Sequence, residues 1–290
     1  MNYEGLIIRP PSEAYSLLLQ VTVGCSHNRC TFCPTYKDKP FRIKSFAEIV
    51  TDIDEASRYS RAQRVFLCDG DALIIPQERL IEILLEIKTK MPQVERIATY
   101  ANAKSILKKT PEQLQDLHRH GLSMIYLGIE SGNNEVLQAI QKGGDFDKIV
   151  SAGKRAKVAG FTLSVAVLLG IGGNERSIPH ALDTAKILSA IDPDFVGALT
   201  LMVVPETPLH EELLQGRFSL PNTFGLLHEL ELMIAHSHFT SCFFTANHAS
   251  NYLPIRARLP HEKEKVLKLI RSVIAQRDKT VLRHETMRAL

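Results

Sequence analysis

The chain has 290 residues, of which 44% are hydrophobic and 23% charged, and its formal net charge is +3 at pH 7. So small a charge excludes the general basic footprint of a nucleic-acid partner, and five cysteines, an odd number, exclude the disulfide framework of a small secreted domain. The N-terminal residues lack an apolar signal core, and no apolar run is long enough to span a bilayer. We therefore expect a cytoplasmic protein without a membrane partner.

Short apolar runs alternate with amphipathic segments along most of the chain. Ser45 with Glu48 forms the pattern of a capping box, and Thr110 followed by Pro111 is typical of a helix start. In chain order the patterns predict a strand at 17–23, a helix at 45–59, a strand at 64–69, a helix at 77–90, a strand at 94–100, a helix at 110–121, a strand at 122–129, a helix at 134–140 and another ending at 159, a strand at 161–169, a helix at 177–190 and a strand at 195–204.

Six strands separated by helices indicate a parallel α/β sheet. Because such crossovers are right-handed, the sheet can coil into a partial (β/α)6 barrel like a TIM barrel. Helices predicted at 223–235 and 262–275 form a C-terminal helical extension, with a polar and aromatic segment at 236–252 between them. We expect an N-terminal segment over 1–14, a barrel core over 15–205, and an extension over 206–290 that packs on the core and closes its substrate side.

Three cysteines lie close together directly after the first predicted strand. Cys25, Cys30 and Cys33 have the spacing Cys-x4-Cys-x2-Cys. Three thiolates leave one iron of a four-iron cluster without a protein ligand, and an open metal position is typical of a catalytic centre. A zinc module is the alternative, with His27 as fourth ligand, but the second ligand pair of a zinc ribbon is missing. The spacing favours an iron–sulfur cluster.

The cysteine loop resembles that of the radical S-adenosylmethionine (radical SAM) superfamily, in which the first interval is usually one residue shorter. The resemblance continues over roughly residues 15–205 and is strongest to the branch of tRNA methylthiotransferases and anaerobic coproporphyrinogen oxidase-like proteins. It rests on motifs at the ends of the second, fourth and fifth strands, which are Asp69-Gly70-Asp71, Gly128-Ile129-Glu130-Ser131 and Gly170-Ile171-Gly172-Gly173.

The resemblance implies a [4Fe-4S] cluster on the three cysteines, with S-adenosylmethionine bound to its open iron. Phe32 then lies against the adenine, although an aromatic side chain that plugs the barrel mouth is an equal alternative. Asp69, Gly70 and Asp71 receive the methionine amino group, since acids pair with an ammonium and glycine permits close approach. Asp-Gly is also an ordinary turn.

The remaining implied cofactor residues follow the later strands. Glu130 accepts hydrogen bonds from the ribose or binds the methionine end, and Lys142 binds the cofactor carboxylate, unless it is an exposed lysine at a helix end. The turn with Gly170 and Ile171 contacts the adenine. Asn102, after the third strand, contacts cofactor or substrate, or caps a strand-to-helix turn.

The implied reaction is the reductive cleavage of S-adenosylmethionine to a 5′-deoxyadenosyl radical, which abstracts a hydrogen atom from the substrate in an oxygen-sensitive enzyme. Since the charge pattern offers no RNA-binding module, we expect a small-molecule substrate. An RNA-modifying enzyme of the same superfamily and a non-catalytic haem or iron–sulfur carrier that retains the fold are the alternatives.

Two further features allow a functional and a structural interpretation. The basic residues Lys37, Lys39 and Lys44 follow the cysteine loop and could dock a reduced flavodoxin or ferredoxin as electron donor, or form a solvated turn. Cys242 could donate a hydrogen atom, or pack within an ordinary loop, whereas Cys68 is expected in the core.

Overall fold

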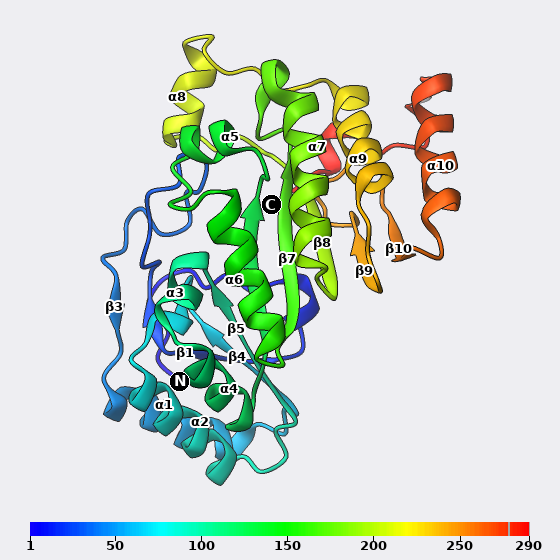
Figure 1. Cartoon of the computed structure of the whole chain (residues 1–290). Coiled ribbons are helices and arrows are strands. Elements are labelled where there is room, and N and C mark those ends of the chain that lie inside the picture. Colours follow the sequence, from blue (N-terminus) through cyan, green and yellow to red (C-terminus); the bar gives the residue numbers. More distant parts are fainter. Residues whose placement is uncertain (278, 290) are drawn as a thin grey trace. The chain divides into compact units, whose positions relative to one another are not determined.

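The computed structural model describes residues 1–277 and 279–289, which form two compact units (Figure 1). Unit 1 comprises residues 1–28, 33–127 and 151–163, and unit 2 comprises residues 29–32, 128–150 and 164–290. The predicted α/β class is confirmed, since most strands pair in parallel and alternate with helices. In the part of the chain that the structure describes, every helix is too short or too polar to cross a lipid bilayer.

Unit 1 contains a parallel sheet in the order β1-β4-β5-β6. Its strands are β1 (Leu17–Gln20), β4 (Arg64–Cys68), β5 (Arg96–Ala101) and the part of β6 (Leu122–Glu130) up to Leu127. Leu19 is opposite Leu67, which is opposite Thr99. The continuous apolar run of β4 is fully buried, as expected for a strand of a parallel sheet that is covered on both faces.

The helices of unit 1 begin largely where the sequence predicts them. These are α1 (Phe46–Tyr59), α2 (Gln77–Lys90) and α4 (Pro111–Arg119), with α1 and α2 side by side (Figure 1). Ser45 and Glu48 form the predicted capping box. The short α3 (Ala103–Lys108) and the 3-10 turn η2 (Ala72–Ile74) were not predicted, because neither has room for two turns of amphipathic pattern.

The predicted first strand at 17–23 consists of two strands. β1 pairs with β4, whereas β2 (Thr22–Val23) pairs antiparallel with β3 (Arg42–Ile43), a hairpin that encloses the cysteine loop in sequence. The N-terminal segment contains the 3-10 turn η1 (Pro11–Glu13), and Glu13 is buried against Arg96 at 2.6 Å. This segment is therefore an integral part of unit 1.

Unit 2 contains β7 (Thr162–Leu169, from Ser164 onward), β8 (Phe195–Thr200) and β9 (Cys242–Thr245), which pair in parallel, and β10 (Arg256–Leu259), which pairs antiparallel with β9. Its helices are α5 (Asn134–Ala139), α6 (Phe146–Val158, which continues into unit 1), α7 (Gly173–Ile191), α8 (Pro208–Leu214), α9 (Thr223–His236) and α10 (Lys263–Gln276), and η3 (Glu285–Met287) is a 3-10 turn. Helix α7 packs against α9, and α9 against α10 (Figure 1).

The C-terminal part is less purely helical than expected. The polar and aromatic segment at 236–252, for which no strand was predicted, contains β9, and β10 follows it. Both strands have four residues, so the alternation of their buried side chains is too short to stand out from the polar neighbours. α7 also begins four residues before the predicted start, at Gly173.

Candidate functional site

Asp71 is one of two fully buried acids in the turn after β4 in unit 1. Its side chain is fully buried, and its Oδ2 accepts hydrogen bonds from Ser26 Oγ and, at 2.8 Å, from Asn102 Nδ2. Its Oδ1 has no hydrogen-bond partner among the described residues. Burial raises the pKa of Asp71, because it disfavours the charged form. This turn thus contains a carboxylate oxygen that lacks a donor.

Both carboxylate oxygens of Asp69 accept hydrogen bonds from neighbouring side chains. Its Oδ1 accepts a hydrogen bond from Tyr36 Oη at 2.6 Å, and its Oδ2 accepts one from Gln20 Nε2 at 3.4 Å. Burial raises the pKa of this carboxyl group as well. Between the two acids, a Cβ on Gly70 would lie 2.7 Å from the Tyr36 ring and 2.9 Å from Cys25 Cβ. Only a residue without a side chain fits against the first cysteine there.

Asn102 caps a strand-to-helix turn, which is one of the two roles that its sequence position suggests. As N-cap of α3 its Oδ1 accepts a hydrogen bond from Ser105 N at 2.8 Å, while its Nδ2 donates to Asp71 Oδ2. The strand-to-helix turn after β5 is therefore linked to the turn after β4 through a buried carboxylate. The sequence predicted these residues separately, and the structure brings them together.

Phe32 and Ile171 lie in one apolar cluster of unit 2. Phe32 is partly buried and packs on a group of buried aliphatic side chains, which are Val136, Ile140, Leu168, Ile171, Leu201 and Leu209. Two backbone hydrogen bonds hold its segment in place, from Thr31 N to Ile140 O at 3.0 Å and from Leu209 N to Thr31 O at 3.1 Å. The two residues expected at the adenine share an apolar surface.

Glu130 and Lys142, both expected at the cofactor, form an ion pair in unit 2. Lys142 Nζ lies 2.9 Å from Glu130 Oε1, and the side chains are 15% and 14% exposed. Gly128 leaves room for the pair, since a Cβ there would lie 2.3 Å from Glu130 Oε1 and 3.0 Å from Lys142 Nζ. Lys142 is therefore no freely solvated lysine at a helix end.

Gly170 is held by a residue that sequence analysis missed. Its N–H donates to Glu229 Oε2 at 2.6 Å, and Ser177 Oγ donates to Glu229 Oε1 at 2.7 Å. Burial raises the pKa of Glu229 to about 7. Nearby, the fully buried His180 contacts Ser131 Oγ through its Nδ1 at 2.8 Å, and burial lowers its pKa to about 4.

One signal for Glu229 was present in the sequence. It lies on the face of α9 that also carries the buried Leu226 and Met233, three residues before and four after it. A glutamate at such a position has to find buried donors.

The three cysteines of the loop are partly exposed. Cys25 and Cys33 belong to unit 1, and Cys30 belongs to the segment 29–32 of unit 2. Over residues 1–277 and 279–289, no three His, Cys, Asp or Glu side chains lie close enough together to hold a metal ion. The assignment of the three thiolates as iron ligands thus stays a prediction.

The cysteines outside the loop are both buried. Cys68 lies in the core, as expected, and burial raises its pKa. Cys242 is 3% exposed at the start of β9, a placement that fits the alternative of a packed residue.

Lys44 cannot take part in the predicted basic docking surface. Its side chain is fully buried, and its Nζ donates to Asp52 Oδ2 at 2.7 Å and to Asn2 O at 2.9 Å. The expectation was wrong because β3 turns this residue inward, where burial of the charge demands a partner. Lys37 is exposed and Lys39 partly exposed, and their ammonium groups donate to Asn28 O and Leu6 O.

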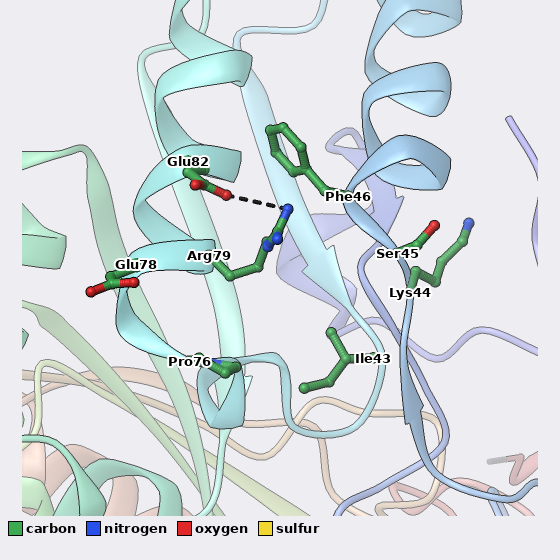
Figure 2. A pocket seen from close by; sticks show the side chains of 8 residues that line it. All are labelled: Ile43, Lys44, Ser45, Phe46, Pro76, Glu78, Arg79 and Glu82. Atoms are coloured by element: carbon green, nitrogen blue, oxygen red, sulfur yellow. Dashed lines mark ion pairs between the residues drawn. The ribbon is translucent and has the colours of Figure 1, made fainter.

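A hollow of about 460 Å³ in unit 1 lies at the N-terminal ends of α1 and α2, away from the predicted site residues. Figure 2 shows the Arg79 side chain extending from α2 towards α1, where its guanidinium lies 4.7 Å from the Phe46 ring centroid and 3.2 Å from Glu82. Arg79 is thus paired with Glu82 within the hollow, while Lys44 pairs with Asp52. The hollow is lined by Ile43, Lys44, Ser45, Phe46, Pro76, Glu78, Arg79 and Glu82.

Comparison with known proteins places most of the predicted site inside one family model. The model of the radical SAM superfamily matches residues 19–185. An uncharacterized protein of Methanocaldococcus jannaschii is 23% identical over 218 residues, which cover 71% of this chain and 66% of that protein. The 4′-phospho-dehydrooxetanocin synthase of Priestia megaterium is 25% identical over 209 residues, which cover 64% of this chain and 28% of that protein.

Among solved structures, coproporphyrinogen III oxidase from Escherichia coli, described as a radical SAM enzyme, matches with a TM-score of 0.54. The match covers 76% of this chain and 51% of that one, at 14% identity. This likeness concerns the fold alone and agrees with the α/β architecture expected from the sequence. This chain matches only part of the length of each of these relatives.

Proposed function

The chain belongs to the radical SAM superfamily, as its cysteine loop and strand-end motifs predicted, and on that premise we propose that it cleaves S-adenosylmethionine reductively to start chemistry on a small molecule. A bound [4Fe-4S] cluster would supply the electron for this cleavage, which would provide the radical that takes hydrogen from the substrate. Cys25, Cys30 and Cys33 are the residues that would hold the cluster.

The observation that carries this proposal is the span of the family match. Residues 19–185 include the cysteine loop and the turns after β4, β6 and β7, so each predicted cofactor residue lies within the matched range. The cysteine loop alone would not distinguish this family, because three cysteines in nine residues also occur in metal sites of other kinds.

The buried acid of unit 1 fits the ammonium of S-adenosylmethionine. Asp71 Oδ1 is buried and has no donor among the described residues, and an unpartnered buried carboxylate oxygen costs free energy. A bound ammonium would supply the missing donor and a compensating charge. Asp69 instead holds Tyr36, so we assign it to shaping the turn.

The predicted residues of unit 2 fit the rest of the molecule. The apolar cluster under Phe32 and Ile171 offers a surface for an adenine ring. Lys142 has three donors, so its ammonium can keep Glu130 and still bind a carboxylate, while the other oxygen of Glu130 can accept a ribose hydroxyl. Unit 2 by itself thus offers groups that fit the nucleoside and the carboxylate of S-adenosylmethionine.

The electron donor and the substrate are proposed by class. A reduced flavodoxin or ferredoxin remains the expected reductant, with Lys37 and Lys39 but without the buried Lys44 on the docking surface. A small molecule remains the expected substrate, with an RNA substrate as the alternative inside the superfamily. A haem or iron–sulfur carrier is the alternative without catalysis.

The test is anaerobic reconstitution followed by iron and sulfide analysis and by measurement of the Kd for S-adenosylmethionine. We expect about four irons per wild-type chain, loss of iron in Cys25→Ala, Cys30→Ala and Cys33→Ala, and full iron in the control Cys242→Ala. Zinc without sulfide in the wild type would refute the proposal.

A second variant tests the ammonium site. Asp71→Asn keeps the shape and an acceptor but removes the charge, so we expect an unchanged iron content and a Kd raised about 10- to 150-fold, since a hydrogen bond to a charged group contributes about 1.5–3 kcal/mol. An unchanged Kd would assign Asp71 to the architecture of the turn.

A further inference from the structure

A fully buried polar network of unit 2 connects the turn after β6 with the turn after β7. These two turns carry Glu130 on one side and Gly170 with Ile171 on the other. The network consists of side chains with no exposed surface from three elements, and these are Ser131, His180, Thr184 and Glu229. Buried polar groups are costly unless they are paired, so their position at these turns calls for an explanation.

On the β7 side, Glu229 fixes the backbone of Gly170. The 2.6 Å hydrogen bond from Gly170 N–H and the 2.7 Å hydrogen bond from Ser177 Oγ reach its two oxygens, so one carboxylate of α9 bridges the turn and the first part of α7. Gly170 has a φ of +84°, and a Cβ there would lie 2.8 Å from Leu226. The turn is thus held by a side chain of α9 and packed against another.

On the β6 side, His180 and Thr184 of α7 fix the residues that follow Glu130. Ser131 Oγ accepts a hydrogen bond from Asn133 N at 3.0 Å and lies 2.8 Å from His180 Nδ1, while Gly132 N donates to Thr184 Oγ1 at 3.0 Å. If the serine hydroxyl donates to Nδ1, the imidazole proton is on Nε2. That nitrogen faces Glu229 Oε2 at 3.9 Å.

Ser131, His180 and Glu229 thus lie in series between the two turns. The contact between His180 and Glu229 is longer than a hydrogen bond, and His180 Nε2 has no hydrogen-bond partner among the described residues. A purely structural link between two helices and two turns would be served as well by apolar packing, which carries no such cost. The polar chain instead fixes backbone N–H groups on both turns, which apolar side chains cannot do.

We infer that Glu229 and His180 are positioning residues, which hold the turns after β6 and β7 in the arrangement that binds the nucleoside part of S-adenosylmethionine. This inference rests on the proposed function. Neither residue needs to touch the ligand, because Glu229 acts through Gly170 and His180 acts through Ser131.

The test measures the Kd for S-adenosylmethionine by equilibrium dialysis in the reconstituted protein, together with iron per chain. In Glu229→Ala the Gly170 N–H and the Ser177 hydroxyl lose their acceptor. Because an unsatisfied buried donor costs free energy, we expect a Kd raised about tenfold. The iron content should be unchanged. Glu229→Gln retains an acceptor for Gly170 N–H, so it should restore the Kd to within about twofold.

Glu231→Gln is the matched control. Glu231 is also in α9 but pairs with Arg271 at 2.9 Å and with His228 at 3.1 Å, and both partners lie outside the two turns. The Kd of Glu231→Gln for S-adenosylmethionine should equal that of the wild type. An equal rise in this control would mean that α9 as a whole is disturbed and would overturn the inference.

If Glu229→Ala does not fold, Ser131→Ala tests the inference instead. It removes one hydroxyl on the β6 side, and we expect a Kd raised about fivefold because the Asn133 N–H and His180 Nδ1 lose their partner. A Kd within twofold of the wild type would overturn the inference. A wild type that binds no S-adenosylmethionine would instead refute the proposed function itself.

Discussion

Replacement of Glu229 by glutamine should make the stability of the protein less dependent on pH. In the folded protein burial raises the pKa of Glu229 to about 7, from an ordinary value of 4.5. The folded state thus binds this proton more tightly than the unfolded chain does. The associated stability is fully present below pH 4.5 and is lost as the pH rises through 7.

The size of the effect follows from these two pKa values. Between pH 5.5 and 8, the difference in proton binding lowers the free energy of unfolding by about 2 kcal/mol in the wild type. Glu229→Gln lacks this proton and can still accept from Gly170 N–H. His180, with its pKa lowered to about 4, is neutral throughout this range when folded, and its titration in the unfolded chain is common to both proteins.

Urea unfolding of the cluster-free protein, followed by far-ultraviolet circular dichroism at pH 5.5 and 8, measures this difference. From pH 5.5 to pH 8, the free energy of unfolding should fall by about 2 kcal/mol less in the variant than in the wild type. A difference in the free energy of unfolding between the two proteins that is the same at both pH values would refute the reasoning. It would mean that the Gly170 N–H and the Ser177 hydroxyl keep the Glu229 carboxylate ionised at pH 5.5 as well as at pH 8.

Two further substitutions test the packing of unit 1. Gly70→Ala places a Cβ 2.7 Å from the Tyr36 ring, so it should cost about 1–3 kcal/mol of stability and lower the iron retained after reconstitution. In the control Gly144→Ala the nearest neighbour of the new Cβ is 3.6 Å away, so stability and iron content should stay unchanged. Equal iron in the two variants would contradict this prediction. Lys44→Met leaves Asp52 buried without its ammonium partner and should lower the urea-derived free energy of unfolding by about 3 kcal/mol, and a loss below 1 kcal/mol would show that the pair is dispensable.

Local signals in the sequence predicted many of the secondary structure boundaries well. The capping box at Ser45 and the Thr110-Pro111 start mark the beginnings of α1 and α4, because caps depend on residues within one turn. α2 has the predicted bounds. β9, β10 and α8 were missed because elements of four to seven residues offer too few positions for a periodic pattern.

The sequence placed the candidate residues at strand ends but did not predict which of them contact one another. Glu130 and Lys142 are twelve residues apart and meet at 2.9 Å, whereas their assignment to the cofactor stays a prediction. Glu229 is 59 residues from Gly170, and only the packing of α9 on α7 brings them together. Lys44 was misplaced because charge alone suggested exposure, whereas the structure buries it with Asp52.

The most direct test of the central claim is the formation of 5′-deoxyadenosine. Reconstituted protein is incubated anaerobically with dithionite and S-adenosylmethionine, with Cys30→Ala as the control, and the nucleoside is quantified. We expect slow release of 5′-deoxyadenosine by the wild type and none by the variant. A brown, iron-loaded wild type that releases no nucleoside would contradict radical chemistry and favour a carrier.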